Sequence, residues 1–348
     1  MTLNNYLTNI ADAVRTKKGS SKKLPLTSIA EEIESIGANN ANIAELPNMG
    51  GSYTNAYIMD YIRDIDAGGW DVTNLKSFPV FGDANSKLET IKFKGIKGTE
   101  KVTSLDGIFS SLSKLTSIDF SDFDTSACTN MLQMLYRCSS LTSLDLSKFD
   151  TSSCTNMGSM FYYCSSLTSL DLSNFDTSSC TSMSNMFSSC SKLSSLDLSK
   201  FDTSACTDMG GMFNSCSKLP SITFGDKWDT SSCTNMSGMF YNCSSLTSLD
   251  LSNFDTSACT SMRYAFDNCS SLTSLTLGAD WGINASITSF GLAYCPLTHD
   301  SCLDVFNKLA DKTQTATTSA TLNLNSTTRA LMSADEIKIA TDKGWTVS

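Results

Sequence analysis

The sequence predicts an α/β solenoid. A parallel sheet with short return helices is preceded by a small helical N-terminal module and closed by an α/β C-terminal cap. Three observations predict this fold: a 26-residue segment recurs through the middle of the chain, apolar residues alternate in one half of each segment, and they follow helical spacing in the other half. A repeat of this length is typical of a solenoid, because one supersecondary unit cannot bury its apolar face alone and must stack on the next.

The repeated segments define the length of the solenoid. Regular segments begin at Leu115, Leu141, Leu167, Leu193 and Leu246, and one with an extra residue begins at Leu219. Degenerate copies precede them from Leu88 and follow them up to Pro296. The sequence therefore predicts about eight stacked coils over residues 88–296.

One half of each segment has the pattern of a short strand. In Leu144-Asp145-Leu146-Ser147 the apolar residues alternate with polar ones. Successive side chains of a strand point to opposite faces, so we expect both leucines to point inward and Asp145 outward. Equivalent strands of successive coils would stack at about 4.8 Å into a parallel sheet.

The other half of each segment has the pattern of a short helix. Within residues 157–164, apolar side chains fall at i, i+3, i+4 and i+7, and Thr155 precedes them as a candidate N-cap. Between strand and helix, residues 149–152 predict a corner, in which Asp, Thr and Ser side chains hydrogen-bond to nearby backbone N–H groups.

Both flanks of the repeats differ from them. Residues 1–37 predict a small helical attachment module with a Ser28…Glu31 capping box, and residues 38–87 predict a linker and an N-terminal cap. After the repeats, residues 297–348 predict a C-terminal cap. It should contain a helix over 301–310, a strand over 321–325, and a helix over 333–343 that starts with a Ser333…Glu336 capping box.

Composition excludes several classes of protein. The net charge is −10, and residues 115–271 hold fifteen Asp, no Glu and seven Lys or Arg. An acidic surface repels phosphates, so we expect no binding to nucleic acid. No apolar run approaches the roughly 18 residues of a membrane span, and the first residues lack the pattern of a secretory signal. We therefore expect a soluble protein without membrane insertion.

The fourteen cysteines recur in register with the repeats. The first cysteine ladder comprises Cys128, Cys154, Cys180, Cys206, Cys233 and Cys259, and the second comprises Cys138, Cys164, Cys190, Cys216, Cys243 and Cys269. Parallel Cβ vectors suit stacking better than disulfide bridging, and neither ladder has the close Cys pairs and His partners of structural zinc. Buried, reduced thiols are expected.

The repeat LTSLDLSNFDTSSCTSMSNMFSSC (167–190) resembles the BspA-type leucine-rich repeats of bacterial surface proteins. This resemblance implies a leucine-rich-repeat solenoid. The segment IADAVRTKKGSSKKLPLTSIAEEIESIG (10–37) resembles the short N-terminal module of tail-associated proteins from phages and prophages of Gram-positive bacteria, and the ending LTHDSCLDVFNKLADKT…LMSADEIKIATDKGWTVS is similar to segments that close such proteins. The combination implies a virion protein, and a bacterial cell-surface adhesin of the BspA type is the alternative.

The outward positions of the strands form the candidate binding surface. Its residues are Ser143, Asp145, Ser147, Ser169, Asp171, Ser173, Ser195, Asp197, Ser199 and Asp250. Ca²⁺ needs about six to eight converging oxygen ligands, which a flat row of carboxylates does not guarantee. No metal, cofactor or catalytic site is predicted. Cys302 lies beside His299, the single histidine, but helix packing explains it better than catalysis.

Together with the absence of a recognisable catalytic site, the resemblance to phage tail-associated proteins implies a non-enzymatic structural protein of a phage virion, such as a tail fibre or baseplate component. Its N-terminal module would bind other virion proteins, and its solenoid would bind a glycan or protein on the host surface. Repeated polar positions suit adhesion, because weak contacts add through multivalency. The sequence identifies neither the receptor nor the oligomeric state, and a homo-oligomer is compatible with it.

Overall fold

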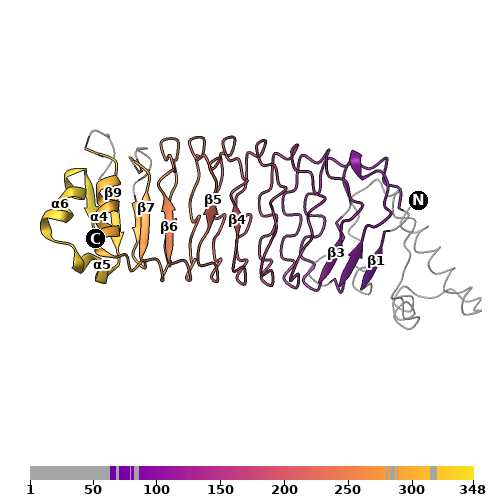
Figure 1. Cartoon of the computed structure of the whole chain (residues 1–348), viewed down its shortest axis with the longest axis horizontal. Helices are drawn as coiled ribbons and strands as arrows, with labels where there is room; N and C mark the ends of the chain where they lie inside the picture. Colours follow the sequence, from indigo (N-terminus) through magenta and orange to yellow (C-terminus); the bar gives the residue numbers. More distant parts are fainter. Residues whose placement is uncertain are drawn as a thin grey trace, which may run out of the picture.

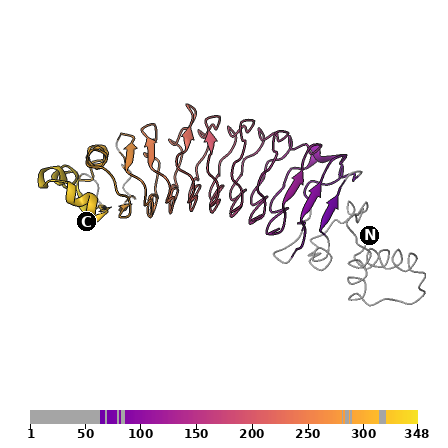
Figure 2. The same cartoon turned by 60° about the horizontal axis from the view of Figure 1, so that its bottom comes forward.

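The structure is a computed structural model that describes residues 63–67, 70–78, 80–81, 86–279, 281–282, 287, 289–313 and 320–348. These residues form a gently bowed rod of stacked coils, with the cap at its C-terminal end (Figures 1 and 2). The parallel-sheet solenoid expected from the sequence is confirmed. Among the described residues, no helix is long and apolar enough to cross a membrane.

Short parallel strands from successive coils make up one side of the rod, here called the sheet face. They are β1 (Asp64–Asp66), β2 (Thr90–Lys92) and β3 (Ser117–Asp119) in one sheet, then the pair β4 (Asp197–Leu198) and β5 (Thr223–Phe224), and the pair β6 (Ser248–Leu251) and β7 (Ser274–Leu277). The register keeps equivalent residues in columns: Ile65 pairs with Ile91, and Ile91 pairs with Ile118. Each column therefore points one residue type into the core.

The expected inward and outward positions are confirmed in the coil that starts at Leu141. Asp145 is exposed, Leu146 is buried and Leu144 is half-buried against the core. Residues 144–146, however, do not form a regular strand, and Ser147 lies in a turn. The backbone hydrogen bonds between this coil and the next lie on the opposite side of the rod, here called the return side, where the chain runs back after the corner.

The return side consists of consecutive turns instead of the expected short helices. Alternate N–H groups donate to the next coil: Met157 to Ser182, Ser159 to Ser184, Phe161 to Met186, and Tyr163 to Ser188. The N–H groups between them donate three residues back, as Met160 does to Met157. Ser159 and Tyr163 have left-handed φ angles of 54° and 58°. A right-handed helix cannot form through such residues.

The core nevertheless contains the residues that the apolar spacing indicated. Met157, Met160, Phe161 and Cys164 are fully buried, as are their equivalents in the neighbouring coils. The phenylalanines stack from coil to coil, with ring centroids 5.7 Å apart between Phe161 and Phe187. Thr155 does not act as an N-cap: its hydroxyl donates to the carbonyl of Thr129, while Asn156 Oδ1 accepts the N–H of Gly158.

The N-terminal end of the described chain adds to the solenoid. Strand β1 pairs in parallel with β2, and Trp70, Val72, Phe78 and Phe81 are buried, so the described residues between 64 and 81 contribute to a further coil before Leu88. A short 3-10 helix, η2 (Thr99–Lys101), follows β2. The expected helical module over 1–37, and the part of the linker before residue 63, lie outside the described residues.

Residues 297–348, the C-terminal cap, contain the three expected elements and two more. The cap elements are α4 (His299–Lys308), β9 (Ala320–Leu324), α5 (Ser326–Leu331), α6 (Ala334–Asp342) and β10 (Trp345–Val347). Strand β8 (Ser289–Leu292), from the range expected for the solenoid, completes their sheet in the order β10-β9-β8. The capping box between Ser333 and Glu336 is present. Ser301 of α4 accepts the N–H of Leu275 and donates to its carbonyl, so α4 satisfies backbone groups at the last strand of the sheet face.

Candidate binding surface

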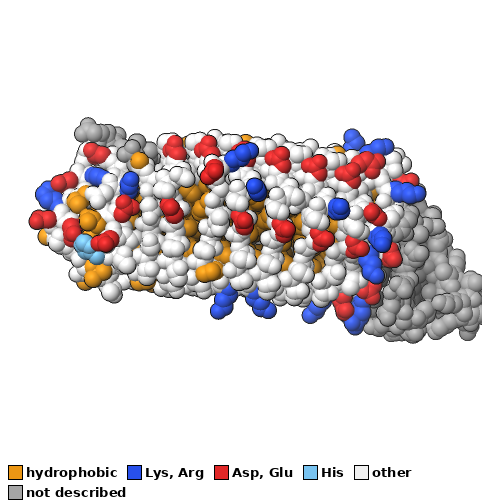
Figure 3. All heavy atoms as spheres, viewed as in Figure 1, with side chains coloured by type: hydrophobic (Ala, Val, Ile, Leu, Met, Phe, Trp, Pro, Cys, Tyr) orange, Lys and Arg blue, Asp and Glu red, His pale blue; other side chains and the backbone are white. Residues whose placement is uncertain are grey.

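The ten predicted site residues lie along the sheet face. Nine are exposed, and Ser199 is half-buried. In a space-filling view, acidic side chains recur in rows along the rod (Figure 3). The structure therefore places these residues at equivalent positions of different coils, as a repeated polar surface.

The carboxylates of this row are held by the backbone that follows them. Oδ1 of Asp145 accepts the N–H of Ser147 at 2.9 Å, and Asp171, Asp197 and Asp250 make the equivalent bond. Hydrogen bonds from Ser147 and Ser173 lower the pKa of Asp145 and of Asp171. Asp145 and Asp171 are therefore ionised at neutral pH. In the described part of the chain, no group of three or more His, Cys, Asp or Glu residues is placed to hold a metal ion.

Two cavities open on the sheet face, and sequence reasoning missed both. One of about 310 Å³ lies between β5 and β6, and its lining is Ile222, Thr223, Phe224, Gly225, Asp226, Trp228, Asp250, Ser252, Asn253 and Phe254. The other, of about 270 Å³, is lined by Ile118, Asp119, Phe120, Ser121, Asp145, Ser147 and Lys148. Three predicted site residues, Asp145, Ser147 and Asp250, thus line cavities with aromatic side chains.

Local departures from the repeat accompany these cavities. Phe120 and Phe224 occupy the strand position where the other regular coils have leucine, such as Leu146. The segment from Leu219 also carries the extra residue. The indole N–H of Trp228 is buried and has no hydrogen-bond partner among the described residues. These departures were the sequence signal that could have located both cavities.

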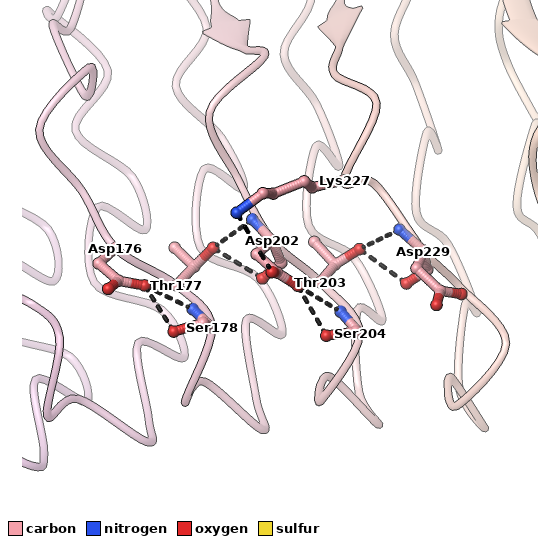
Figure 4. A network of polar contacts seen from close by, with 8 residues as sticks. All are labelled: Asp176, Thr177, Ser178, Asp202, Thr203, Ser204, Lys227 and Asp229. Atoms are coloured by element: carbon pink, nitrogen blue, oxygen red, sulfur yellow. Dashed lines mark hydrogen bonds and ion pairs between the residues drawn. The ribbon is translucent and has the colours of Figure 1, made fainter.

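The corner carboxylates have the structural role that the sequence indicated. Asp176 Oδ1 accepts the N–H and the hydroxyl of Ser178, and Asp202 does the same with Ser204 (Figure 4). Between coils, the buried Thr177 accepts the N–H of Asp202 and donates to its carbonyl. The corner thus satisfies its own backbone and joins neighbouring coils.

The cysteines are buried and free throughout the chain. The thiols of both ladders donate to backbone carbonyls, as Cys164 does to Leu135, and Cys295 extends the second ladder by one coil. Burial raises the pKa of Cys154 to about 11 and that of Cys180 to about 12, so both remain neutral thiols. The expected packing role is confirmed.

The His299 and Cys302 pair is also structural. His299 Nε2 lies 2.9 Å from Glu336 Oε1, which links α4 to α6, and Nδ1 lies 3.1 Å from Asp300 Oδ1. Cys302 is fully buried, and burial raises its pKa to about 12. A thiol in this state is a poor nucleophile.

Comparison with known sequences identifies the repeat. Three overlapping stretches, residues 77–196, 131–226 and 196–288, match a family described as Mycoplasma protein of unknown function, DUF285. The chain belongs to this family. No curated protein matches the chain. All ten predicted site residues and both cavities lie within the DUF285 region.

Solved leucine-rich-repeat structures resemble the DUF285 chain only distantly. A leucine-rich cell surface protein from Faecalibacterium prausnitzii is 14% identical, with a TM-score of 0.27, over 81% of this chain and 82% of its own. An internalin from Listeria monocytogenes is 14% identical, with a TM-score of 0.28, over 97% and 93%. A leucine-rich repeat protein from Eubacterium ventriosum is 15% identical, with a TM-score of 0.26, over 70% and 80%. Similarity at this level says nothing about what the chain binds.

Proposed function

We propose that the protein is a non-enzymatic adhesin of a bacterial cell surface, which binds its ligand with the sheet face of the solenoid. The observation that carries this proposal is the recurrence of exposed Ser and Asp residues in successive coils, beside two cavities with aromatic walls. Concave sites with apolar walls and a few polar groups are typical of ligand binding. Repetition lets weak contacts add.

The residues most often used in catalysis support a binding role over an enzymatic one. The single histidine joins two helices of the cap through Glu336, and the cysteines are buried, neutral thiols. The sheet face instead offers carboxylates held by turn amides and hydroxyl groups. Such groups suit hydrogen bonding to a glycan or to a polar protein surface.

The cell-surface location rests on the resemblance of the repeats to BspA-type proteins, and membership of a bacterial repeat family supports it. A second candidate is a virion protein that binds other virion proteins through residues 1–37. It rests on the resemblance of residues 10–37 and of the C-terminal segment to phage tail-associated proteins. Labelled-antibody electron microscopy of producing cells, and of particles released from them, separates the two locations.

The binding function is tested with a triple variant, Asp145→Asn, Asp171→Asn and Asp197→Asn. Asparagine keeps the oxygen that accepts the turn N–H but removes the charge. We expect weaker binding of the purified protein to the bacterial or animal cells that the wild type binds, with a circular dichroism spectrum that shows the fold is retained.

The matched control carries the same three changes in the corner row, at Asp150, Asp176 and Asp202. It loses equal charge away from the proposed contact, so it should bind as the wild type does. Equal binding by wild type and sheet-face variant would remove this face from the proposed function.

A further inference from the structure

The return side of the solenoid carries every tyrosine and arginine of the regular coils. Within residues 115–271 these are Tyr136, Tyr162, Tyr163, Tyr241, Tyr264, Arg137 and Arg263. They fall into an N-terminal tyrosine cluster (Tyr136, Arg137, Tyr162 and Tyr163) and a C-terminal tyrosine cluster (Tyr241, Arg263 and Tyr264). The proposed function uses none of them.

In the N-terminal cluster, aromatic rings from adjacent coils lie together under a cation. Tyr136 and Tyr162 stack with ring centroids 4.7 Å apart and planes 9° apart. The guanidinium carbon of Arg137 lies 5.3 Å from the ring centroid of Tyr136 and 5.9 Å from that of Tyr163. Tyr163 is 47% exposed. Arg137 has no acidic partner among the described residues, so its charge is available to an incoming anion.

The C-terminal cluster repeats this combination. The guanidinium carbon of Arg263 lies 4.5 Å from the ring centroid of Tyr264, and Nη2 of Arg263 donates to the hydroxyl of Tyr264. Tyr241 accepts a hydrogen bond from Asn268 of the next coil. Tyr264 is 48% exposed. One coil further, Tyr294 is 58% exposed and occupies the repeat position of Tyr163.

The backbone shows that folding alone does not favour these residues. Arg137, Tyr163 and Tyr264 have φ angles of 61°, 58° and 60°, in the left-handed region. Other coils use small or amide side chains at the same two positions: Ser189, Ser215, Asn242 and Asn268 at one, and Ser159, Asn185, Gly211 and Gly238 at the other. A bulky side chain is disfavoured there, and these side chains stay at the surface. Strain without burial points to a role in binding.

We propose that these clusters bind an extended acidic polysaccharide, which lies along the solenoid axis across both. Tyrosine rings offer flat apolar faces to the C–H face of a sugar ring, and arginine pairs bidentately with a carboxylate. The clusters are separated by about three coil spacings, or ~14 Å. Ser189, Asn214 and Ser215 are partly exposed, lie between them in the repeat and suit hydroxyl-rich units.

The surface favours a polysaccharide over a protein partner. A stable protein interface buries about 800 Å² on each partner and has an apolar centre. In the described part of the chain, the large exposed apolar side chains of the repeats' return side are Tyr163, Tyr264 and Tyr294, which lie on different coils. Separate aromatic platforms with polar residues between them fit a repeating polar polymer.

Binding of the full-length protein to polygalacturonate, with neutral dextran as control, tests the proposal by biolayer interferometry. We expect binding to polygalacturonate alone. A double variant, Arg137→Asn and Tyr163→Ser, places residues found at this position of other coils and should therefore fold. It should lose at least about tenfold in affinity, which corresponds to ~1.4 kcal/mol.

The sheet-face triple variant separates this proposal from the proposed function, because it should bind polygalacturonate as the wild type does. Absent binding to polygalacturonate, equal binding to dextran, or full affinity in the double variant would each overturn the proposal. A protein ligand would also overturn the proposal. It would be indicated if cell binding depended on Arg137 and Tyr163 and were destroyed when the cells are treated with protease but not when they are treated with glycosidase.

Discussion

The buried threonines of the corner are the residues that join one coil to the next most directly. Thr125, Thr151, Thr177, Thr203 and Thr230 each accept the N–H of the corner aspartate in the following coil and donate to its carbonyl. All five are at most 1% exposed. One hydroxyl therefore satisfies two backbone groups in the buried corner, and valine, which lacks the hydroxyl, would not replace it equally.

Replacing Thr177 with Val should destabilise the protein by about 1–3 kcal/mol. Valine has the same shape but leaves the N–H and the carbonyl of Asp202 unpaired in a buried corner. Urea unfolding measures the loss. The matched control is Thr181→Val, because the exposed hydroxyl of Thr181 makes one bond, to the carbonyl of Thr155, that water can replace. Equal stability of the two variants would show that the ladder contributes nothing specific.

In the cap, helices α4 and α6 are joined by a hydrogen bond between two titratable side chains, His299 and Glu336. Hydrogen bonds to Asp300 and Glu336 raise the pKa of His299 above its ordinary value of 6.5. Hydrogen bonds from Ser333, and a smaller effect of His299, lower the pKa of Glu336 below 4.5. The contribution of His299 to the free energy of unfolding is complete below pH 6.5 and is lost as pH rises through the pKa of the folded state. The contribution of Glu336 is present above pH 4.5 and is lost as pH falls through its folded pKa.

A His299→Ala variant should therefore lose most thermal stability between about pH 4.5 and 6.5, and little at about pH 9, where the imidazole of the wild type is neutral. Melting temperatures across this range test the expectation. Asn307→Ala, an exposed change on the same helix, should show no such pH dependence. A deficit that is constant with pH would mean that the ring acts by packing and not by charge.

Over the whole molecule, rows of aspartates hold turns that recur in every regular coil. The pKa values of Asp145, Asp171, Asp176, Asp197, Asp202 and Asp255 are lowered from 3.8 by hydrogen bonds from the serine two residues on. A lowered pKa stabilises the fold above 3.8, and this stabilisation is lost as pH falls through the folded values. In a solenoid, each coil depends on its neighbours, so these losses act together.

We expect the urea midpoint of the wild type to fall steeply as pH decreases below about 4. The corner variant with Asn at positions 150, 176 and 202 lacks two of the carboxylates with a lowered pKa, Asp176 and Asp202. It should lose less stability between neutral and acid pH, because asparagine accepts the same N–H without titrating. Circular dichroism during urea titrations at several pH values provides the measurement. Parallel pH profiles for wild type and variant would contradict this role of the corner carboxylates.

The sequence by itself determined the repeat length, the solenoid, and which side chains enter the core. Leu146 is inward, Asp145 is outward, and Met157, Met160 and Phe161 are buried, as their spacing indicates. Apolar spacing along the chain was sufficient, because burial depends on which side chains leave water together. The corner carboxylates were equally predictable, since an Asp side chain bonds to an N–H only two residues away.

Only the tertiary structure decided the backbone of the return side and the make-up of the surfaces. Residues 157–164 have helical spacing, yet every second N–H group bonds to the next coil, about 25 residues away in sequence. The cavity beside Phe224 and the stacking of Tyr136 on Tyr162 likewise join different coils. Such contacts do not exist until coils stack, and hydrogen bonds between coils then outweigh the local helical pattern because each buried N–H must find a partner.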